Sequence, residues 1–380
     1  MPVSLSINSI TSFSSYLEKM KRIILHVDLD CFFAAIEVRD NPLYKGLPLV
    51  VGADPKRGKG RGVVSTCSYE AREYGIHSGM PISKAYRLCP DAVFVLPNFD
   101  KYLEASEQFF RIIQKYSSVC QEAGIDEGYL DLTDVCADYD ESRNIAERIR
   151  QEVYDTLDIT CSVGCAPTKP FAKIASEHNK PNGITIIEPE NVKSFVEDMD
   201  ITKIPGVGRN TKKYYNEKGI YTIGDLLNTP LPKMLELFGK YGRMIWEIVH
   251  GMNNNPVGDF YVRKSIGKSR TFNQDTADIK DVLKTLETLS ARIHEYLREH
   301  KIFYKTVGIT IRFEGFETFT RSKSMPYPIQ NEQQAMEIAF GLLREFLNER
   351  RKARLTGIRF SNLQKNETTR QTTLLNYIEV

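Results

Sequence analysis

The sequence has 380 residues, of which 41% are hydrophobic and 26% are charged. This composition is typical of a globular protein, and the length predicts two to four domains. No apolar run approaches the roughly 20 residues that span a membrane, so we expect no membrane association.

The net charge of +2 is unevenly distributed. Residues 254–363 contain 19 Lys and Arg against 13 Asp and Glu, a local charge of +6, so the rest of the chain carries −4. A basic C-terminal third indicates a polyanionic partner at that end, although a solvated surface can carry the same bias.

Residues 1–20 are rich in serine and lack the basic start and sustained apolar core of a secretory signal. We expect this extension to be disordered or to reflect an upstream start codon. The seven cysteines are dispersed, and none forms a Cys-x-x-Cys pair. This usage indicates reduced thiols in the cytoplasm and argues against zinc or disulfides.

Residues 22–30 form an apolar, β-branched run that predicts a buried strand with Asp28 near its end. Residues 31–38 continue with helical periodicity. Free backbone N–H groups at the start of this helix would lie beside the acidic strand end. That combination binds metal-bridged phosphates.

Residues 47–52 predict a second strand, and residues 55–62 form a loop with four cations among glycines. A nucleic-acid contact and a solvated loop explain this loop equally well. Residues 63–75 then pass from strand to helix, where Tyr69 and Arg72 share one helical face. Arg72 can grip a phosphate or pair with a neighbouring glutamate.

An acidic hairpin follows an amphipathic helix predicted over residues 100–118. Asp126 and Glu127 lie at its turn, between glycines that permit tight backbone approach. Such a pair is often only a solvated turn. If this hairpin neighbours the first strand, however, Asp28, Asp126 and Glu127 converge. Three close carboxylates imply bound cations, and oxygen ligands suit Mg²⁺ or Mn²⁺.

Further periodic segments predict a helix over residues 140–157, a strand over 159–165, a helix from 169 and a strand over 184–187. The core pattern is therefore β-α-β-β-α-β with an insertion after the first strand. This pattern predicts an α/β (α+β) fold with a ferredoxin-like core.

The remaining chain contains a candidate helix-hairpin-helix at residues 204–213, whose glycines Gly206 and Gly208 would let backbone N–H groups approach a DNA phosphate. A second glycine pair, Gly239 and Gly242, is expected within another helical pair. Beyond a linker, helices near 276–300 and 331–349 alternate with strands at 305–314, 318–325 and 355–361. We predict a second β/α domain there.

Five motifs, taken together and in this order, resemble the Y-family translesion DNA polymerases, and most closely the DNA polymerase IV-like enzymes of archaea and bacteria. The resemblance runs from about residue 21 to residue 362 and rests on Asp28-Leu29-Asp30-Cys31-Phe32-Phe33, Tyr69-Glu70-Ala71-Arg72, Ile125-Asp126-Glu127-Gly128-Tyr129-Leu130-Asp131, Phe171-Ala172-Lys173-Ile174-Ala175 and Lys180-Pro181-Asn182-Gly183. The family usually has Ser at position 124, Ala or Ser at 128 and, in some archaeal members, an aromatic residue at 31.

The resemblance implies a DNA-directed DNA polymerase of low fidelity. Asp28, Asp126, Glu127 and the Leu29 carbonyl would hold two Mg²⁺ ions, with Mn²⁺ as a substitute. Phe33 would be the steric gate that excludes the ribose 2′-hydroxyl. Residues implied to bind the dNTP are Phe32, Phe33, Thr66, Tyr69, Arg72 and Lys173.

The same resemblance implies a palm at 21–31 and 98–187, fingers at 32–97, a thumb at 188–253, a linker at 254–263, a little finger at 264–362 and a tail at 363–380. Primer–template DNA is the implied polymer partner, and we expect a monomer. Residues implied to bind DNA are Gly206, Gly208, Lys212, Arg263, Lys264, Lys268 and Arg270.

The last ten residues resemble a peptide that binds a sliding clamp. Gln371, Leu374 and Tyr377 have the spacing of a single helical turn that plugs a clamp pocket, whereas Ile378 departs from the family preference for an aromatic residue. A tail that is apolar by chance is the alternative.

Two other functions share parts of this pattern. A catalytically silent, polymerase-like DNA-binding subunit would be expected to lack the metal carboxylates. A nucleotide cyclase shares a ferredoxin-like two-metal core but needs neither a thumb that grips duplex nor a clamp tail.

Overall fold

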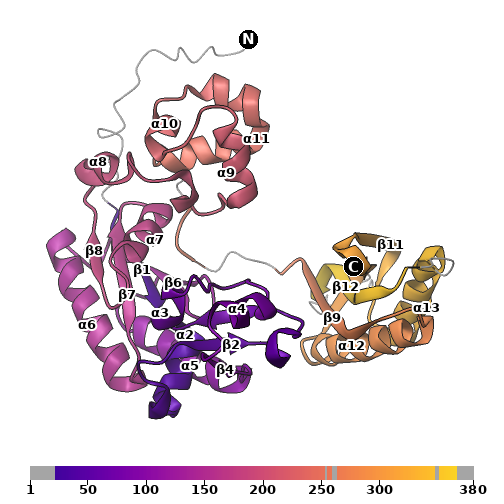
Figure 1. The fold of residues 1–380 in the computed structure, drawn as a ribbon. Helices are drawn as coiled ribbons and strands as arrows, with labels where there is room; N and C mark the ends of the chain where they lie inside the picture. The colour runs from indigo at the N-terminus through magenta and orange to yellow at the C-terminus, as the bar shows by residue number, and fades with distance from the viewer. Residues whose placement is uncertain (1–21, 253–254, 259–262, 347–350, 366–380) are drawn as a thin grey trace, which may run out of the picture. The chain divides into compact units, whose positions relative to one another are not determined.

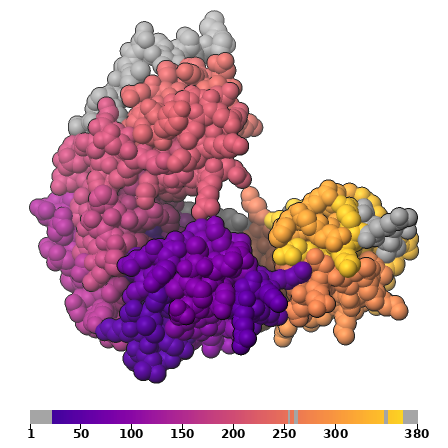
Figure 2. Space-filling view, in the orientation of Figure 1, coloured from indigo at the N-terminus to yellow at the C-terminus, as the bar shows by residue number. Residues whose placement is uncertain are grey.

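The computed structural model describes residues 22–252, 255–258, 263–346 and 351–365. The chain divides after residue 259 into two compact units (Figure 1). Figure 2 shows the N-terminal unit in indigo to pink and the C-terminal unit in orange to yellow. No helix in the described ranges is long and apolar enough to cross a membrane. The domain boundaries expected from the sequence stay a prediction.

A five-stranded sheet organises the N-terminal unit, with β1 (Ile24–Leu29) at its centre. The strand order is β5-β6-β1-β7-β8, and β1 runs antiparallel to both neighbours. The predicted ferredoxin-like core is confirmed, and β8 extends it because α7 returns the chain parallel to β7. The other strands are β5 (Cys120–Glu122), β6 (Glu127–Asp131), β7 (Cys161–Ala166) and β8 (Ile184–Ile186).

Alternate residues of β1 enter different cores, as a strand buried on both faces requires. Leu25, Val27 and Leu29 pack in the core that contains α5 (Phe99–Ile113) and α6 (Tyr139–Leu157). Ile24 instead packs in the core that contains α7 (Lys169–His178). His26 and Asp28 share the face of Ile24, so they point to the side that α7 covers.

Gly164 of β7 lets α7 lie unusually close to the sheet. A Cβ atom at this position would lie 2.1 Å from the Ala172 carbonyl oxygen and 2.2 Å from the Ser176 nitrogen. Gly164 is also the cross-strand partner of His26. The missing side chain therefore brings the helix that carries Lys173 against the polar end of β1.

The insertion between β1 and α5 contains a small three-stranded sheet of order β3-β2-β4. It packs with its own apolar core, which includes Val50, Val64, Ile76 and Ile82. The basic loop predicted at 55–62 includes one short 3-10 turn, η2 (Lys56–Gly58). The elements are α2 (Phe32–Asp40), η1 (Pro42–Tyr44), β2 (Leu49–Gly52), β3 (Val64–Cys67), α3 (Tyr69–Glu73), α4 (Ile82–Leu88) and β4 (Val93–Val95).

A series of helices follows β8, and α11 is the longest of them. They are η3 (Pro189–Asn191), α8 (Val192–Val196), η4 (Ile201–Lys203), α9 (Arg209–Asn216), α10 (Ile223–Leu227) and α11 (Leu231–Val249). Helix α11 is interrupted at Gly239, which adopts φ 58° and ψ −142°. Only glycine reaches this region without strain, so the break accounts for the glycine expected within a helical pair.

The C-terminal unit is an antiparallel sheet of order β11-β10-β12-β9, with α12 and α13 packed against one face (Figure 1). The predicted second β/α domain is confirmed as a fold. The elements are β9 (Ser265–Thr276), α12 (Ile279–Glu299), β10 (Ile302–Phe313), η5 (Glu314–Phe316), β11 (Thr318–Ile329), α13 (Glu332–Leu343), η6 (Arg344–Phe346) and β12 (Ala353–Lys365).

The sequence prediction missed strand β9, whereas the helix predicted near 276–300 is confirmed as α12. Residues 265–276 lie at the sheet edge, and most of their side chains are exposed. A polar edge strand has neither the apolar run nor the alternation that marks a strand in sequence.

Candidate active site

The three acidic residues meet at one end of the central sheet. Asp28 in β1 and Glu127 in β6 are direct cross-strand partners. The Leu29 N–H group donates to the Asp126 carbonyl oxygen at 2.9 Å, which fixes the hairpin turn against the end of β1. The backbone therefore brings the three residues together, whereas the cluster of possible ligand atoms among the described residues includes Asp28 and Glu127 but not Asp126.

Two lysines balance these carboxylates. Lys173 of α7 pairs with Glu127, and Lys180, in the turn before β8, pairs with Asp28. All four side chains are partly buried, with 13–23% of each exposed. Opposite charges at such sites stabilise each other more than they would in water.

The pKa values of the carboxyl groups are pushed in different directions. Burial raises the pKa of Asp28, against the lowering effect of the Lys180 ammonium group. Burial and then the charge of Glu127 raise the pKa of Asp126. Contact with His26 and then with Lys173 holds the pKa of Glu127 well below its usual range. The ionised forms of Asp28 and Asp126 are therefore disfavoured unless positive charge lies nearby.

His26 is a member of this cluster that the sequence analysis did not assign. It is fully buried, and its Nδ1 lies 2.7 Å from the Ser176 hydroxyl. Its Nε2 lies 3.4 Å from a Glu127 oxygen and has no hydrogen-bond partner among the described residues. Burial lowers the pKa of His26. The strand period, which puts residues 26 and 28 on one face, is the signal that could have found it.

The donor set suits a divalent cation. One ligand atom each from His26, Asp28 and Glu127 lie within 4.8 Å of one another. Carboxylate oxygens are the ligands that Mg²⁺ and Mn²⁺ prefer, and the unpartnered imidazole nitrogen faces the same space.

Asp30 is a second unassigned residue, and it joins four segments of the chain. It is 2% exposed, and it accepts hydrogen bonds of 2.8 Å from the Thr160 hydroxyl, the Ser162 hydroxyl and the Asn182 N–H group. The Tyr69 hydroxyl lies 3.4 Å away. Asp30 therefore connects β1 to the segment that enters β7, to the turn that carries Lys180 and to helix α3.

Helix α2 begins two residues after Asp30, with Cys31 at its N-cap. Cys31 adopts a left-handed conformation with φ 47°, and no side chain caps the helix start. The first N–H groups of a helix have no partner within it. The N–H groups of Phe32 and Phe33 therefore have no partner within the helix.

The other residues expected to contact a nucleotide lie in α2, α3 and β3. The Arg72 guanidinium stacks over the Tyr69 ring, 4.7 Å from its centroid, and pairs with no carboxylate of the described residues. Phe33 is half-buried and stacks on Tyr102 with ring centroids 4.2 Å apart, whereas Phe32 is buried in the core. Thr66 is half-buried in β3.

Comparison with known proteins decides the family. Models of the impB/mucB/samB family, of its C-terminal domain and of the DNA polymerase-iota thumb domain match residues 27–177, 263–374 and 202–253. DNA polymerase IV 2 of Methanosarcina mazei is 40% identical over 94% of this chain and 96% of its own length. DNA polymerase IV of Streptococcus pneumoniae is 39% identical over 90% of this chain and 97% of its own length.

The chain belongs to the Y-family DNA polymerases. A solved Y-family DNA polymerase chimera of Dbh and Dpo4 is 32% identical and matches with a TM-score of 0.82 over 90% of this chain and 100% of its own. DinB from Sulfolobus solfataricus is 31% identical and matches over the same shares with a TM-score of 0.60.

In this Y-family polymerase, the three thumb residues expected to bind DNA differ in how freely they could reach a phosphate. Gly206 and Gly208 are exposed, and Gly206 adopts φ 95°. Gly208 directly precedes the uncapped start of α9. Lys212 instead pairs with Asp200, so it can reach a phosphate only by giving up that partner.

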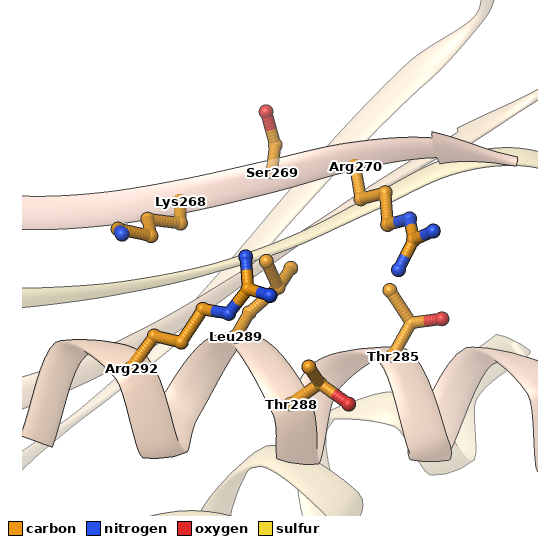
Figure 3. Close-up of a pocket in the computed structure, with 7 residues that line it drawn as sticks. All are labelled: Lys268, Ser269, Arg270, Thr285, Thr288, Leu289 and Arg292. Carbon is orange, nitrogen blue, oxygen red and sulfur yellow. The ribbon is translucent and has the colours of Figure 1, made fainter. Parts of the chain in front are cut away.

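The four basic residues expected to bind DNA at the end of the linker and the start of the little finger also differ in their contacts. Arg263 bonds to the Tyr296 hydroxyl at 3.1 Å, and Lys264 is exposed. Lys268 and Arg270 lie beside α12, in a pocket that Figure 3 shows. The four residues expected to bind a clamp, Gln371, Leu374, Tyr377 and Ile378, lie outside the described residues.

One departure from the family pattern has a local reason. A Cβ atom at Gly128 would lie 2.9 Å from the Phe110 ring and 3.1 Å from the Ile113 side chain. Because α5 packs so closely on β6, the alanine or serine usual at this position would collide with it.

Proposed function

We propose that Asp28, Asp126, Glu127 and the Leu29 carbonyl hold two divalent cations, Mg²⁺ by preference and Mn²⁺ as a substitute. When bound, such ions activate a primer 3′-hydroxyl and offset the charge of the transferring phosphoryl group and the departing pyrophosphate. The observation that carries the proposal is the cross-strand pairing of Asp28 with Glu127 beside the Asp126 turn.

The class of reaction follows from the family. This chain is a DNA-directed DNA polymerase of the low-fidelity, translesion type, and its relatives over nearly its whole length are DNA polymerases. Insertion of dNTPs opposite damaged or undamaged template bases is the reaction that the carboxylates would serve.

Positive groups around the carboxylates would bind the dNTP triphosphate. Arg72 presents a guanidinium that pairs with no carboxylate of the described residues, and it can make two parallel hydrogen bonds to a phosphate. Tyr69 would hold that guanidinium by stacking. Lys173 would exchange its bond with Glu127 for one with the triphosphate, and the N–H groups of Phe32 and Phe33 would complete the cradle.

Phe33 would select the sugar. Its ring is half-buried, and its stacking on Tyr102 restricts its movement. A fixed ring against C2′ leaves no room for the hydroxyl of a ribonucleotide, so dNTPs are favoured over rNTPs. Thr66 would contact the phosphate or the nascent base pair.

DNA contacts would come from both units. Gly206 and Gly208 expose backbone close to the start of α9, which suits a phosphate contact without sequence readout. On the C-terminal sheet, the face opposite the helices carries small residues that include Gly267, Gly308 and Gly357. Gly267 and Gly308 would allow close approach of a phosphate backbone, whereas Gly357 is buried beside the Ser269 side chain. A solved relative is described as an insertion ternary complex of Dbh DNA polymerase.

The proposed partners are primer–template DNA, dNTPs and a sliding clamp bound through residues 371–378. We propose a monomer that acts in the cytoplasm, where DNA and dNTPs are found in cells without a nucleus.

Primer extension with dNTPs and Mg²⁺ tests the assignment. The native chain should extend a primer, and Asp126→Ala combined with Glu127→Ala should abolish extension while DNA binding persists. Equal extension by both proteins would defeat the proposed metal site. Absence of extension by the native chain, with normal DNA binding, would favour a catalytically silent subunit.

A further inference from the structure

The imidazole of His26 is held at one ring nitrogen and has no hydrogen-bond partner at the other. The side chain is fully buried in β1, and its Nδ1 lies 2.7 Å from the Ser176 hydroxyl of α7. Nε2 makes no hydrogen bond to any part of the chain that the structure describes. Leaving a polar atom buried without a partner costs free energy, so the position of Nε2 calls for a physical explanation.

The hydrogen bonds around Ser176 determine which nitrogen of His26 carries the proton. The Ser176 hydroxyl donates its only hydrogen to the Lys173 carbonyl oxygen at 2.9 Å. It must therefore accept a hydrogen bond from Nδ1 of His26. A neutral imidazole that is protonated at Nδ1 has a lone pair at Nε2, which is the form that binds a metal ion.

This lone pair faces the carboxylates of the candidate active site. Nε2 lies 3.4 Å from a Glu127 oxygen, and one ligand atom each from His26, Asp28 and Glu127 lie within 4.8 Å of one another. Two lone pairs that face each other at this distance repel. An ion bound to both atoms at about 2.0–2.2 Å would hold them about 3 Å apart at a right angle, so a cation fits between them.

The imidazole ring is held in this orientation by its neighbours. Tyr129 is its cross-strand partner in β6, with ring centroids 4.6 Å apart. Gly164 is its partner in β7, where the missing side chain lets α7 lie close. The strand period puts His26 on the same face as Asp28. The lone pair is therefore directed at the carboxylates before any ion binds.

A nitrogen ligand changes which ion this set of atoms prefers. Mg²⁺ takes oxygen ligands and keeps much of its water, whereas imidazole nitrogen suits transition ions such as Zn²⁺. Zn²⁺ sites that keep an open position commonly have three protein ligands drawn from histidine and carboxylate side chains. His26, Asp28 and Glu127 supply such a set without a cysteine.

The lysines of the site do not remove this preference. Lys173 pairs with Glu127 and Lys180 pairs with Asp28, so any entering ion must replace these contacts. That competition weakens the binding of every divalent ion, Mg²⁺ included. The lone pair at Nε2 adds affinity only for an ion that accepts nitrogen, and the nitrogen therefore sets the selectivity.

We propose that Nε2 of His26, together with the carboxylates of Asp28 and Glu127, binds a divalent transition ion of the Zn²⁺ type in the chain without DNA or nucleotide. An ion held there occupies carboxylates that Mg²⁺ needs, so it competes with the ion that supports synthesis. The inference rests on the proposed function in taking Asp28 and Glu127 as cation ligands.

The test uses the full chain with ¹⁵N-labelled histidine, in the absence of DNA and nucleotide. The chain contains six histidines, and His26→Asn identifies the ring signals of His26 by their loss. Before any ion is added, the ¹⁵N shifts should show a proton at Nδ1 and none at Nε2. One equivalent of Zn²⁺ should then shift the Nε2 signal, whereas Mg²⁺ should leave it in place.

Two variants provide matched affinities, measured by competition with a chromophoric chelator. His26→Asn keeps a donor for Ser176 and removes Nε2, so Zn²⁺ binding should weaken by at least about 10-fold, a loss seen even for outer partners of metal ligands. His77→Gln removes an exposed histidine and should match the native chain. Mg²⁺ binding should be the same in all three chains.

Zn²⁺ shifts confined to exposed histidines such as His77 would mean an adventitious ion only and would overturn the inference. Equal Zn²⁺ affinities of the native chain and His26→Asn would overturn it as well. If His26→Asn does not fold, contacts with the Tyr129 ring identify the signal in the native chain. An Nε2 shift that Zn²⁺ leaves unchanged there would again overturn the inference.

Primer extension with Mg²⁺ keeps the two proposals apart. Normal extension by the native chain without a Zn²⁺ shift at His26 would overturn this inference and leave the proposed function standing. A Zn²⁺ shift at His26 in a native chain that extends no primer would overturn the proposed function and leave this inference standing.

Discussion

Phe33 stacks on Tyr102 with their ring planes only 11° from parallel. Tyr102 is fully buried, and its hydroxyl group donates a hydrogen bond to Glu37. The proposed gate therefore rests on a residue that is itself held in the core.

This contact predicts a graded effect on sugar selection. Phe33→Ala should raise ribonucleotide incorporation sharply because the ring is removed. Tyr102→Leu should raise it less, since the gate stays but loses its flat support. Competition between dNTPs and rNTPs in single-nucleotide primer extension measures both effects.

Tyr102→Phe is the matched control for that series. It keeps the stacked ring and loses the bond to Glu37, so selection should be preserved while stability falls by roughly 1–3 kcal/mol. If Phe33→Ala relaxes selection and Tyr102→Leu leaves it unchanged, the supporting role of Tyr102 is wrong.

Lys173 should matter for nucleotide binding. Lys173→Met is expected to raise the KM for dNTPs about 10-fold, equivalent to about 1.4 kcal/mol of lost binding. Steady-state kinetics at saturating DNA measures it. Lys169→Met serves as the control, because this lysine of the same helix bonds to Gln121 and the Pro256 carbonyl instead. Equal KM values for the two variants would contradict the triphosphate contact.

Asp30→Asn should destabilise the N-terminal unit. The carboxylate accepts from two hydroxyl groups and one backbone N–H group, and an asparagine would turn its NH₂ group toward at least one of these donors. We expect a loss of roughly 1–3 kcal/mol in the free energy of unfolding, measured with urea. Thr160→Ala, which removes one of these bonds, should cost less. A larger loss in Thr160→Ala would refute the central role of Asp30.

Gly128→Ala should also destabilise, because the new methyl group would press on Phe110. A cost of about 1–3 kcal/mol is typical of overpacking. Phe110→Leu combined with Gly128→Ala should then be less destabilising than the two separate costs added together. Strict additivity in a double-mutant cycle would show that the two residues do not collide.

Deletion of residues 371–380 should abolish clamp-stimulated synthesis and leave basal primer extension intact. The residues proposed to bind the clamp lie within the deleted peptide, whereas the carboxylates proposed to bind the metal ions do not. Extension with and without the sliding clamp measures the effect. Full stimulation of the truncated chain would remove the clamp assignment.

The parts of this fold that sequence could predict are those with strong apolar patterning. The strand around Val27 could be predicted because burial on both faces requires a continuous apolar run. The acidic hairpin could be predicted because glycines flank its tight turn. Strand β9 could not, since an exposed edge strand carries no such signal.

The site shows the same division. Asp28, Asp126 and Glu127 could be placed together from their motifs, but the roles of His26 and Asp30 depend on contacts with Ser176 and Asn182, about 150 residues away. The pairing of Lys212 with Asp200 likewise depends on how η4 and α9 pack.

Gly164 has no functional group, yet it sets how deep α7 lies against the sheet. Any side chain there would push the helix outward and carry the Lys173 ammonium group away from Glu127. A residue without a side chain thereby influences the balance of charge around the carboxylates.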